Sequence, residues 1–596
     1  MSMHTIQLSN GAMRLRLSTG GQMVALESSS VRLLSLSADP VLCEVSRADT
    51  RAATSVSSAH LRQHSDSEAE FEVDIDIGVL ATLSIRVALS DPDDNGTAVI
   101  CRLFLRAQRP PEADVRIRWF WNFRLASAET RLFAPLYHGL GLHTSRARRQ
   151  SWNYVCAGRG SGGSRLALPL IDESPLAGGT HLTYFADPLF STGITLARDD
   201  APDQFECEFL AAAGAEQFQE RTFGLYLHQS DAHGALQGFF RHMLPGSPAG
   251  PAWLHEIAIA HYDFLSEKGQ GWFHDIDRLG ELFTREERSQ IALTLHGWYD
   301  FLGRYCYDTS TGTLDRQWTV MPRGDKHEMT LEEMHRRIAY AKERGFRLLL
   351  YYADGMAIDS GAPHFRKEIV FLEPDGTPRQ HHWGGPDTVA QTYVMDPVHP
   401  RVKEFFRCYT RALLQEFGRE IDGLTWDETF TTRVGDLSRG PHPGYADREF
   451  MLLASELREM IKQEDSSLAF LASDAAGLAL PQEAGTSYWR AFPAQNALLF
   501  DGTYQDSQCY PTAWQYGLFP NYRNVLWSCN WRPVENFEWT VLGVKAFGAP
   551  LAISNGWGEN RGISRYTEAE VKALMDLYRF RRDHRSRVRW IDSTDL

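Results

Sequence analysis

The chain has 596 residues, of which 43% are hydrophobic and 23% charged, a composition typical of a globular protein with more than one domain. Its 61 basic and 76 acidic residues leave a formal net charge of −15. That balance argues against nucleic acid or an anionic membrane as a partner, because both require a basic surface. Aromatic residues make up 12% of the chain and include 16 Trp, which fits a protein that stacks sugar rings and equally fits a large aromatic core.

Eight cysteines are scattered singly, without a CxxC pair or a metal-ligand spacing, and this favours buried thiols over a disulfide framework. Residues 1–7 lack a basic stretch followed by an apolar run, so no signal peptide is predicted. No apolar stretch reaches the roughly 20 residues that a membrane span needs. The expected location is therefore the cytoplasm.

Residues 1–245 have the pattern of an antiparallel β-sandwich domain. Apolar and acidic residues alternate along 71–77, and Val115, Ile117, Trp119 and Trp121 alternate with polar residues. Such alternation is typical of strands with one buried and one solvated face. Turn sequences separate many such runs at short spacing, which indicates a sandwich rather than a mixed fold.

A Pro- and Gly-rich stretch at 246–254 predicts a linker, and residues 255–596 predict a (β/α)8 TIM barrel. Short apolar runs alternate there with amphipathic runs, as in parallel βα units. Thr330 and Glu333 form the pattern of a capping box and predict a helix start. The expected strands are 256–263, 290–297, 346–354, 421–427, 468–474, 497–501, 524–529 and 549–554, and the expected helices are 330–344, 400–417, 447–463, 535–547 and 567–582.

Acidic and aromatic residues recur at the ends of the expected strands, where a barrel builds its active site. Asp427 is the strongest candidate, because Trp426, Asp427 and Glu428 arrive together behind an apolar strand. Trp383 lies on a long loop, 359–395, that is expected to cover the pocket. The predicted substrate-binding residues are Asp263, Trp298, Asp300, Asp354, Trp383, Trp426, Glu428, Trp527, Trp531 and Trp557.

Cleavage of a glycosidic bond needs two carboxyl groups, one ionised beside the anomeric carbon and one that protonates the leaving oxygen. Asp427 and Glu428 are neighbours on a strand and point to opposite faces, so the second group is expected from another strand. Asp501 is the first choice and Asp474 the second, while Glu428 has a structural or substrate-contacting role.

The segment 422–428, Asp-Gly-Leu-Thr-Trp-Asp-Glu, resembles the nucleophile strand of the retaining α-glucosidase/α-xylosidase family. The stretches 345–354 and 395–402 are similar to the strand and helix lead that precede it in that family. The α-galactosidase families share the plan of a β-sandwich, a barrel, a nucleophile on strand four and an acid on strand six. This resemblance implies that Asp427 is the nucleophile and Asp501 the acid/base of a retaining α-glycosidase.

The sequence also departs from the pattern of these families. The Trp stands one place later than in the first family, the downstream Met-Asn-Glu is absent, and the surroundings of Asp501 match neither acid/base motif. Enzymes that resemble endo-acting α-N-acetylgalactosaminidases take the acid from strand five, which would favour Asp474.

Several alternatives remain open from the sequence. A non-catalytic sugar-binding or scaffold protein would hold its strand-end acids in ion pairs with Lys or Arg. An inverting glycosidase would place the two carboxyls further apart. A sugar isomerase or lyase would need a metal or a Lys base, and no expected strand ends in Lys. His327 and His335 are eight residues apart, so no metal site is predicted. The expected partner is a carbohydrate, and no cofactor is expected.

Overall fold

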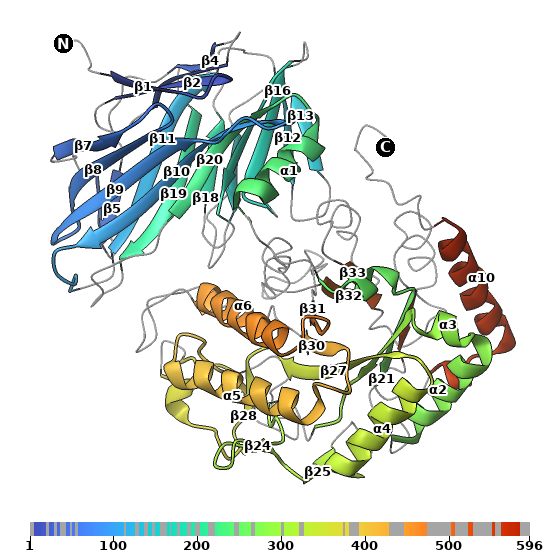
Figure 1. Ribbon diagram of the computed structural model, residues 1–596. Helices are drawn as coiled ribbons and strands as arrows, with labels where there is room; N and C mark the ends of the chain where they lie inside the picture. Colours follow the sequence, from blue (N-terminus) through green and yellow to red (C-terminus); the bar gives the residue numbers. More distant parts are fainter. Residues whose placement is uncertain are drawn as a thin grey trace. The chain divides into compact units, whose positions relative to one another are not determined.

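The computed structural model in Figure 1 consists of two compact units, Met1–Gly246 and Ser247–Leu596. No helix in the described part of the chain is long and apolar enough to cross a membrane. The structure describes residues 5–18, 23–28, 32–35, 43–47, 50–53, 58–112, 115–125, 130–135, 141–145, 150–154, 164–166, 168–175, 179–187, 192–196, 203–211, 221–243, 250–263, 269–299, 303–320, 327–372, 376–380, 392–427, 446–473, 502–506, 523–527, 551–554 and 562–584.

The N-terminal unit contains two large sheets, and nearly all neighbouring strands in them are antiparallel. Trp121 and Phe205 of one sheet contact Phe223 of the other, with ring centroids 4.7 and 5.1 Å apart. The predicted alternation is confirmed in β8, where Phe71 and Val73 are fully buried and the residues between them are part-exposed. Side chains of the two facing sheets therefore form the core of a sandwich.

The strand order of each sheet is set by its hydrogen-bonded neighbours. The eleven-stranded sheet has the order β1 (Thr5–Ser9), β2 (Met13–Ser18), β3 (Met23–Ser28), β4 (Arg32–Ser35), β11 (Val115–Leu125), β19 (Asp203–Ala211), β18 (Thr192–Leu196), β14 (Gln150–Tyr154) and β15 (Ser164–Arg165), with β5 (Cys43–Arg47) paired to β11 and β6 (Thr50–Ala53) to β5. The nine-stranded sheet has the order β13 (Gly141–Ser145), β12 (Thr130–Pro135), β16 (Leu170–Pro175), β17 (His181–Ala186), β20 (Arg221–His228), β10 (Gly96–Ala107), β9 (Leu80–Leu89), β8 (Glu68–Asp76) and β7 (Ser58–His64), and α1 (Ala232–Met243) follows β20.

The second unit is built on eight parallel strands, as predicted. Among the described residues no hydrogen-bonded ladder joins its two end strands, β33 and β34. The strand order is β33 (Arg523–Trp527), β32 (Gly502–Asp506), β31 (Ala469–Ser473), β30 (Gly423–Asp427), β27 (Arg347–Asp354), β22 (Ile291–Leu295), β21 (Ile259–Asp263) and β34 (Leu551–Ser554).

Helices flank these strands, and Figure 1 shows them outside the sheet. The predicted helix 400–417 is confirmed, and the start of helix 330–344 is confirmed because the Thr330 hydroxyl accepts from the Glu333 amide at 3.1 Å. The helices are α2 (Gln270–Leu282), α3 (Arg285–Arg288), α4 (Leu331–Glu343), α5 (Pro400–Phe417), α6 (Ala446–Glu464) and α10 (Glu568–His584), with 3-10 turns η1 (Ala252–Glu256), η3 (Lys367–Ile369) and η4 (Ile563–Arg565).

Small antiparallel hairpins lie in the loops that follow β22 and β27. They are β23 (Tyr307–Asp308) with β24 (Thr313–Leu314), β25 (Gln317–Val320) with β26 (His327–Thr330), and β28 (Ala357–Asp359) with β29 (Thr392–Val394).

The sixth strand differs from its prediction. The sequence predicts a strand at 497–501 that ends in Asp501, whereas β32 begins at Gly502 and ends at Asp506. Its register is set on both sides, since Leu471 of β31 pairs with Gly502 and Trp527 of β33 pairs with Asp506. The predicted end of the strand is therefore five residues too early, and Asp506 occupies its carboxyl end, while residues 497–501 lie outside the described residues.

Asp422 anchors the opposite, N-terminal end of β30. Its carboxylate accepts hydrogen bonds from Lys342 of α4 at 2.5 Å, from Arg347 at 2.9 Å and from the Leu348 amide at 2.7 Å. The carboxylate is buried, and charge-assisted bonds of this kind are stronger than neutral ones. They tie β30 to β27 and to α4.

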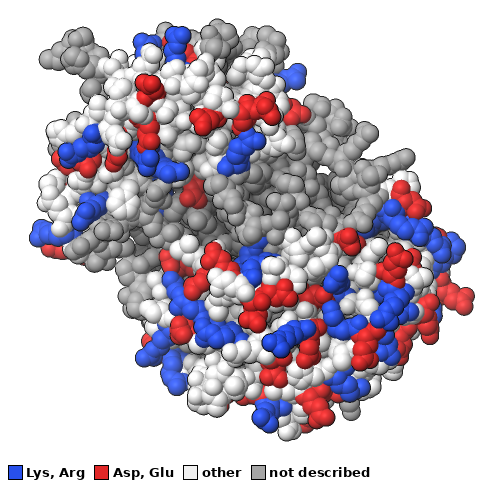
Figure 2. All heavy atoms as spheres, viewed as in Figure 1, with Lys and Arg blue, Asp and Glu red and all other residues white. Residues whose placement is uncertain are grey.

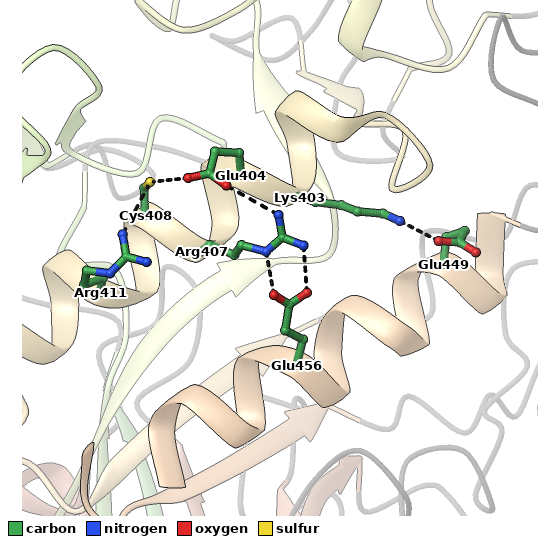
Figure 3. A network of polar contacts seen from close by, with 7 residues as sticks. All are labelled: Lys403, Glu404, Arg407, Cys408, Arg411, Glu449 and Glu456. Carbon is green, nitrogen blue, oxygen red and sulfur yellow. Dashed lines mark hydrogen bonds and ion pairs between the residues drawn. The ribbon is translucent and has the colours of Figure 1, made fainter. Parts of the chain in front are cut away.

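Helices α5 and α6 are joined by a network of ion pairs on their outer faces (Figure 3). Arg407 holds Glu456 with two bonds of 2.6 and 2.9 Å, and Lys403 holds Glu449 at 2.5 Å. Each exposed pair contributes at most about 1 kcal/mol, so their main effect is to fix the relative position of the two helices. Figure 2 shows acidic and basic side chains intermingled over the second unit, which is the surface expected of such pairing.

A histidine bridges α4 to the C-terminal part of α5. His335 contacts Glu416 at 2.8 Å through Nε2 and Glu420 at 2.9 Å through Nδ1. Burial lowers the pKa of His335, but the hydrogen bonds and charges of Glu420 and Glu416 outweigh it, so the net pKa is raised. A raised folded-state pKa stabilises the fold below the unfolded pKa, and this contribution is lost as the pH rises through the folded pKa.

We therefore expect His335→Gln to lower the thermal midpoint of the second unit more at about pH 5.5 than at about pH 8, on either side of the usual His pKa of about 6.5. Differential scanning calorimetry of both proteins at the two pH values measures this. The double variant Glu416→Gln, Glu420→Gln is the control and removes the pH dependence of the difference. An equal loss at both pH values would contradict a charged His335.

Candidate functional site

Two carboxylates lie at the carboxyl ends of neighbouring strands. Asp354 is the last residue of β27 and Asp427 the last of β30, and the two are register partners. The Gly355 amide donates to the Asp427 carbonyl at 2.7 Å, which holds the turn after β27 against the end of β30. Adjacent strands lie about 4.8 Å apart, so the two backbones present their acids side by side. Asp427 is 8% exposed and Asp354 4%.

A β-bulge in β27 controls which side chains meet Asp427. Tyr351 pairs with Thr425 and Ala353 with Trp426, so Tyr352 is an extra residue without a register partner. The Tyr351 hydroxyl donates to Asp427 Oδ2 at 3.2 Å. The hydroxyl of Tyr352 instead bonds to Thr410 of α5 at 2.8 Å, on the helix side of the sheet. The bulge thus interrupts the regular alternation of side chains along β27 at Tyr352.

Aromatic rings from the end of β22 surround Tyr351. The His296 ring lies edge-on at 3.9 Å between centroids, and Tyr299 stacks at 5.4 Å. Burial, followed by the charges of Asp354 and Asp427, raises the pKa of Tyr299 well above its usual value. Burial lowers the pKa of His296 well below its usual value, so this ring is neutral at pH 7. The Tyr299 phenol therefore stays protonated and can donate to a carboxylate or to a ligand.

Three of these residues were not predicted from the sequence: His296, Tyr299 and Tyr351. The strand-end stretches that hold them were recognised, but only Trp298 and the acids were selected. The pair Tyr351-Tyr352 was the signal that could have found one of them. Consecutive residues of a strand point to opposite faces, so one of the two tyrosines had to face away from the helices.

Trp426 does not line the pocket, contrary to the prediction. Its ring is fully buried on the helix side, 5.3 Å from Phe406 of α5 and 4.9 Å from Phe450 of α6. Its Nε1 donates to the Gly355 carbonyl at 2.8 Å. Strand alternation explains the correction, because Trp426 and Asp427 are consecutive and project to opposite faces.

Asp263 and Trp298 are likewise buried within the protein rather than presented to a substrate. Burial lowers the pKa of Arg337, and the charges of Glu333 and Asp263 act against that effect, so Asp263 lies near a guanidinium of α4. Trp298 is fully buried, and its Nε1 donates to the Tyr351 carbonyl at 2.8 Å. Both therefore contribute to packing, and Trp298 supports the backbone of the residue that bonds Asp427.

The remaining predicted site residues have no described side chain. Trp527 is the last residue of β33, and only its backbone register is described. The others lie outside the described residues: Asp300, Trp383, Glu428, Asp474, Asp501, Trp531 and Trp557.

Side chains with metal-ligand geometry in the described part of the chain lie in the N-terminal unit rather than at these strand ends. In the stretch 325–335, which was considered for a metal from the sequence, His335 bonds to Glu416 of α5 and to Glu420 just beyond it, and Glu328 bonds to Gln317 at 3.0 Å. At the strand ends themselves the described chemistry consists of two carboxylates, phenol donors and a neutral imidazole. Such a set can stabilise a positive centre and exchange protons with it.

Solved structures with a similar fold include α-glycosidases, the class of enzyme that the sequence resembles. AgaB, an α-galactosidase of glycoside hydrolase family 36 from Geobacillus stearothermophilus, matches with a TM-score of 0.58 at 11% identity over 98% of this chain and 86% of that chain. The α-N-acetylgalactosaminidase NagBb from Bifidobacterium bifidum matches with a TM-score of 0.54 at 12% identity over 97% and 93%. The α-galactosidase from Lactobacillus brevis matches with a TM-score of 0.54 at 10% identity over 100% and 86%.

No protein-family model and no curated protein sequence matches the chain. At these identities the structural likeness establishes the fold, a β unit followed by parallel βα units, and leaves the activity to be argued from the residues.

The packing of Trp426 gives a direct test of its role. We expect Trp426→Leu to destabilise the second unit by about 2–4 kcal/mol, because it leaves a cavity between the sheet, α5 and α6. Trp426→Phe keeps the ring stack, loses the bond to Gly355 and costs about 1 kcal/mol. Chemical denaturation followed by fluorescence and circular dichroism measures both. A Leu variant as stable as the parent protein would contradict the packing role.

Proposed function

We propose that the chain is a retaining α-glycosidase that acts on α-galactosides or α-N-acetylgalactosaminides, and that its eight strands form a closed (β/α)8 barrel. The single observation that carries this proposal is Asp427: a nearly buried carboxylate at the carboxyl end of a central parallel strand, bonded to the Tyr351 phenol and adjacent to Asp354. The names of the similar structures, α-galactosidases and an α-N-acetylgalactosaminidase, supply the substrate class.

Asp427 is the proposed nucleophile. A carboxylate attacks the anomeric carbon while the glycosidic bond breaks and the acid/base residue protonates the leaving oxygen. Water, deprotonated by the same acid/base residue, then cleaves the glycosyl-enzyme ester and releases the sugar and the free carboxylate. The hydrogen bond from Tyr351 to Oδ2 orients this carboxylate and disperses its charge in a site with little water. Asp354, on the neighbouring strand, is proposed to bind hydroxyl groups of the sugar.

The acid/base residue is proposed to come from the strand next but one to β30. Asp506 is the preferred residue, because β32 ends there and the carboxyl ends of parallel strands meet at one edge of the sheet. In sequence, Asp501 directly precedes β32 and Asp474 directly follows β31. Both remain candidates, in that order of preference after Asp506.

The sugar is proposed to be enclosed by residues of the loops after the strands, including Asp300, Trp383, Glu428, Trp531 and Trp557. Trp527, at the end of β33, completes this set. Aromatic faces of this kind stack on the apolar face of galactose, and carboxylates bind its hydroxyl groups.

We expect Asp427→Asn to lower kcat on p-nitrophenyl α-galactoside by at least about a thousandfold, because the amide cannot form the covalent intermediate. Asp422→Asn is a matched control: it makes the same change to a buried carboxylate at the other end of β30. The control is expected to lose stability and keep kcat within a few fold. Full activity of the Asp427 variant would refute the assignment.

The acid/base residue can be separated from the other acids by leaving-group dependence. An acid/base variant loses activity toward alkyl α-galactosides, which need protonation, far more than toward dinitrophenyl α-galactoside, which leaves without it. We expect this pattern for Asp506→Asn, with Asp501→Asn and Asp474→Asn measured alongside. If Asp501→Asn or Asp474→Asn shows this leaving-group dependence and Asp506→Asn does not, that other residue is the acid/base.

A further inference from the structure

The N-terminal unit holds a cluster of metal-ligating side chains far from the strand ends of the second unit in sequence. Asp172 on β16, His181 on β17 and His228 on β20 come from three neighbouring strands of the nine-stranded sheet. Asp172 Oδ2 lies 2.8 Å from His181 Nδ1, and Asp172 Oδ1 lies 3.1 Å from His228 Nε2. The three ligand atoms all lie within 4.8 Å of one another.

The register of the strands places these side chains on one face of the sheet. His181 pairs directly with His228, and Asp172 pairs with Thr183, two residues along from His181. Residues two apart share a face of a strand, so the cluster needs no distortion of the backbone. Donors carried by three paired strands are held more rigidly than donors on loops.

The three side chains differ in burial, and His181 is the most exposed of them. Asp172 is 2% exposed and His228 1%, whereas the side chain of His181 is 19% exposed. Burial raises the pKa of Asp172, but the hydrogen bonds and charges of the two histidines outweigh it, so the net pKa is lowered and the group is a carboxylate. A buried carboxylate requires compensating positive charge or hydrogen bonds.

The surroundings of His228 match the outer shell of a metal-bound histidine. Its Nε2 faces Asp172 Oδ1 at 3.1 Å and the Thr183 hydroxyl at 2.9 Å, and its other nitrogen, Nδ1, lies 3.3 Å from the Ser230 hydroxyl. Metal-bound histidines usually donate this second N–H to an oxygen, which fixes the tautomer and the ring orientation. The Thr183 hydroxyl donates to Asp172 Oδ1 at 3.0 Å, and the Tyr226 ring stacks on His228 at 5.2 Å. Both contacts restrict movement of the donors.

We propose that Asp172, His181 and His228 bind one divalent transition-metal ion, with zinc as the preferred ion and water as the fourth ligand at the exposed edge of His181. Two imidazoles and one carboxylate are ligands of zinc, with metal–ligand distances of about 2.0–2.2 Å. Tetrahedral donors at those distances are about 3.4 Å apart. The Asp172–His181 and Asp172–His228 contacts, now 2.8 and 3.1 Å, would widen to that spacing, and all three donor atoms already lie within 4.8 Å of one another.

The ion serves to clamp β16, β17 and β20, and it lies next to α1. A Cβ added to Gly234 of α1 would lie 3.1 Å from His228 Nδ1 and still closer to Ser230, so this glycine permits the close approach of the helix. Binding of the ion to the folded state alone stabilises the N-terminal unit by mass action. This role is separate from glycoside cleavage and does not depend on the proposed function.

The full-length protein, stripped of metal with a chelator, is titrated with zinc alone and with cobalt alone. We expect about one zinc per chain by elemental analysis, a zinc-dependent rise in the thermal midpoint, and the visible absorption of four-coordinate cobalt. His181→Gln changes the most exposed ligand and so keeps the fold; it is expected to abolish all three signals. Asp172→Asn is the second variant and is expected to do the same.

His242→Gln is the matched control, because His242 on α1 faces Tyr226 and Phe185 and is not one of the three ligands. It should bind zinc and cobalt as the parent protein does. If the parent protein binds no zinc at saturation and its thermal midpoint is unchanged, the cluster is a hydrogen-bond network only and the proposal fails. Equal zinc binding by His181→Gln and the parent protein would also overturn it.

Discussion

The alternation of side chains along β30 determines what lies on each side of the sheet in the second unit. Trp426 enters the aromatic layer between the sheet and helices α5 and α6, and the next residue, Asp427, therefore projects to the other face. The strand is fixed at its N-terminal end by the bonds to Asp422 and at its C-terminal end by the Gly355 amide. The position of the carboxylate is thus set by packing and backbone hydrogen bonds several residues away from it.

The β-bulge in the neighbouring strand, β27, allows both Tyr351 and Asp354 to lie on the same face as Asp427. In a regular strand without a bulge, Tyr351 and Asp354 would lie on opposite faces of β27, because they are three positions apart. With the bulge, Tyr351 bonds Asp427 while Asp354 remains its register partner, and Tyr352 fills the helix side. The rings of His296 and Tyr299 exclude water from this group, which strengthens each polar contact inside it.

Hydrophobic periodicity was sufficient to predict the number of parallel strands and helices such as α4 and α5, whose starts carry clear capping signals at Thr330 and Pro400. It placed the end of the sixth strand too early, at Asp501, whereas pairing with β31 and β33 extends that strand to Asp506. It also missed α2, which begins after Gly269 without a side-chain cap. The local sequence pattern therefore predicts that a strand or helix is present, whereas hydrogen bonding to the neighbouring strands determines where a strand ends.

Site residues were harder to predict, for a related reason. An aromatic or acidic residue near a strand end has the same sequence signal whether it faces the helices or the pocket. Trp426 and Asp263 face the helices, whereas Asp427 projects to the opposite face of the sheet from Trp426, with Asp354 as its register partner. The cluster of Asp172, His181 and His228 had no signal at all, because its members are separated along the chain and meet only when β16, β17 and β20 pair.

The central claim is that Asp427 forms a covalent bond with the sugar during turnover. The most direct measurement is mass spectrometry of peptides from protein incubated with a 5-fluoro-α-galactosyl fluoride, which forms the glycosyl-enzyme and releases it slowly. The account predicts one labelled peptide per chain, with the sugar esterified to Asp427. A label on another carboxylate, or turnover without any label and with inversion of the anomeric centre, would contradict it.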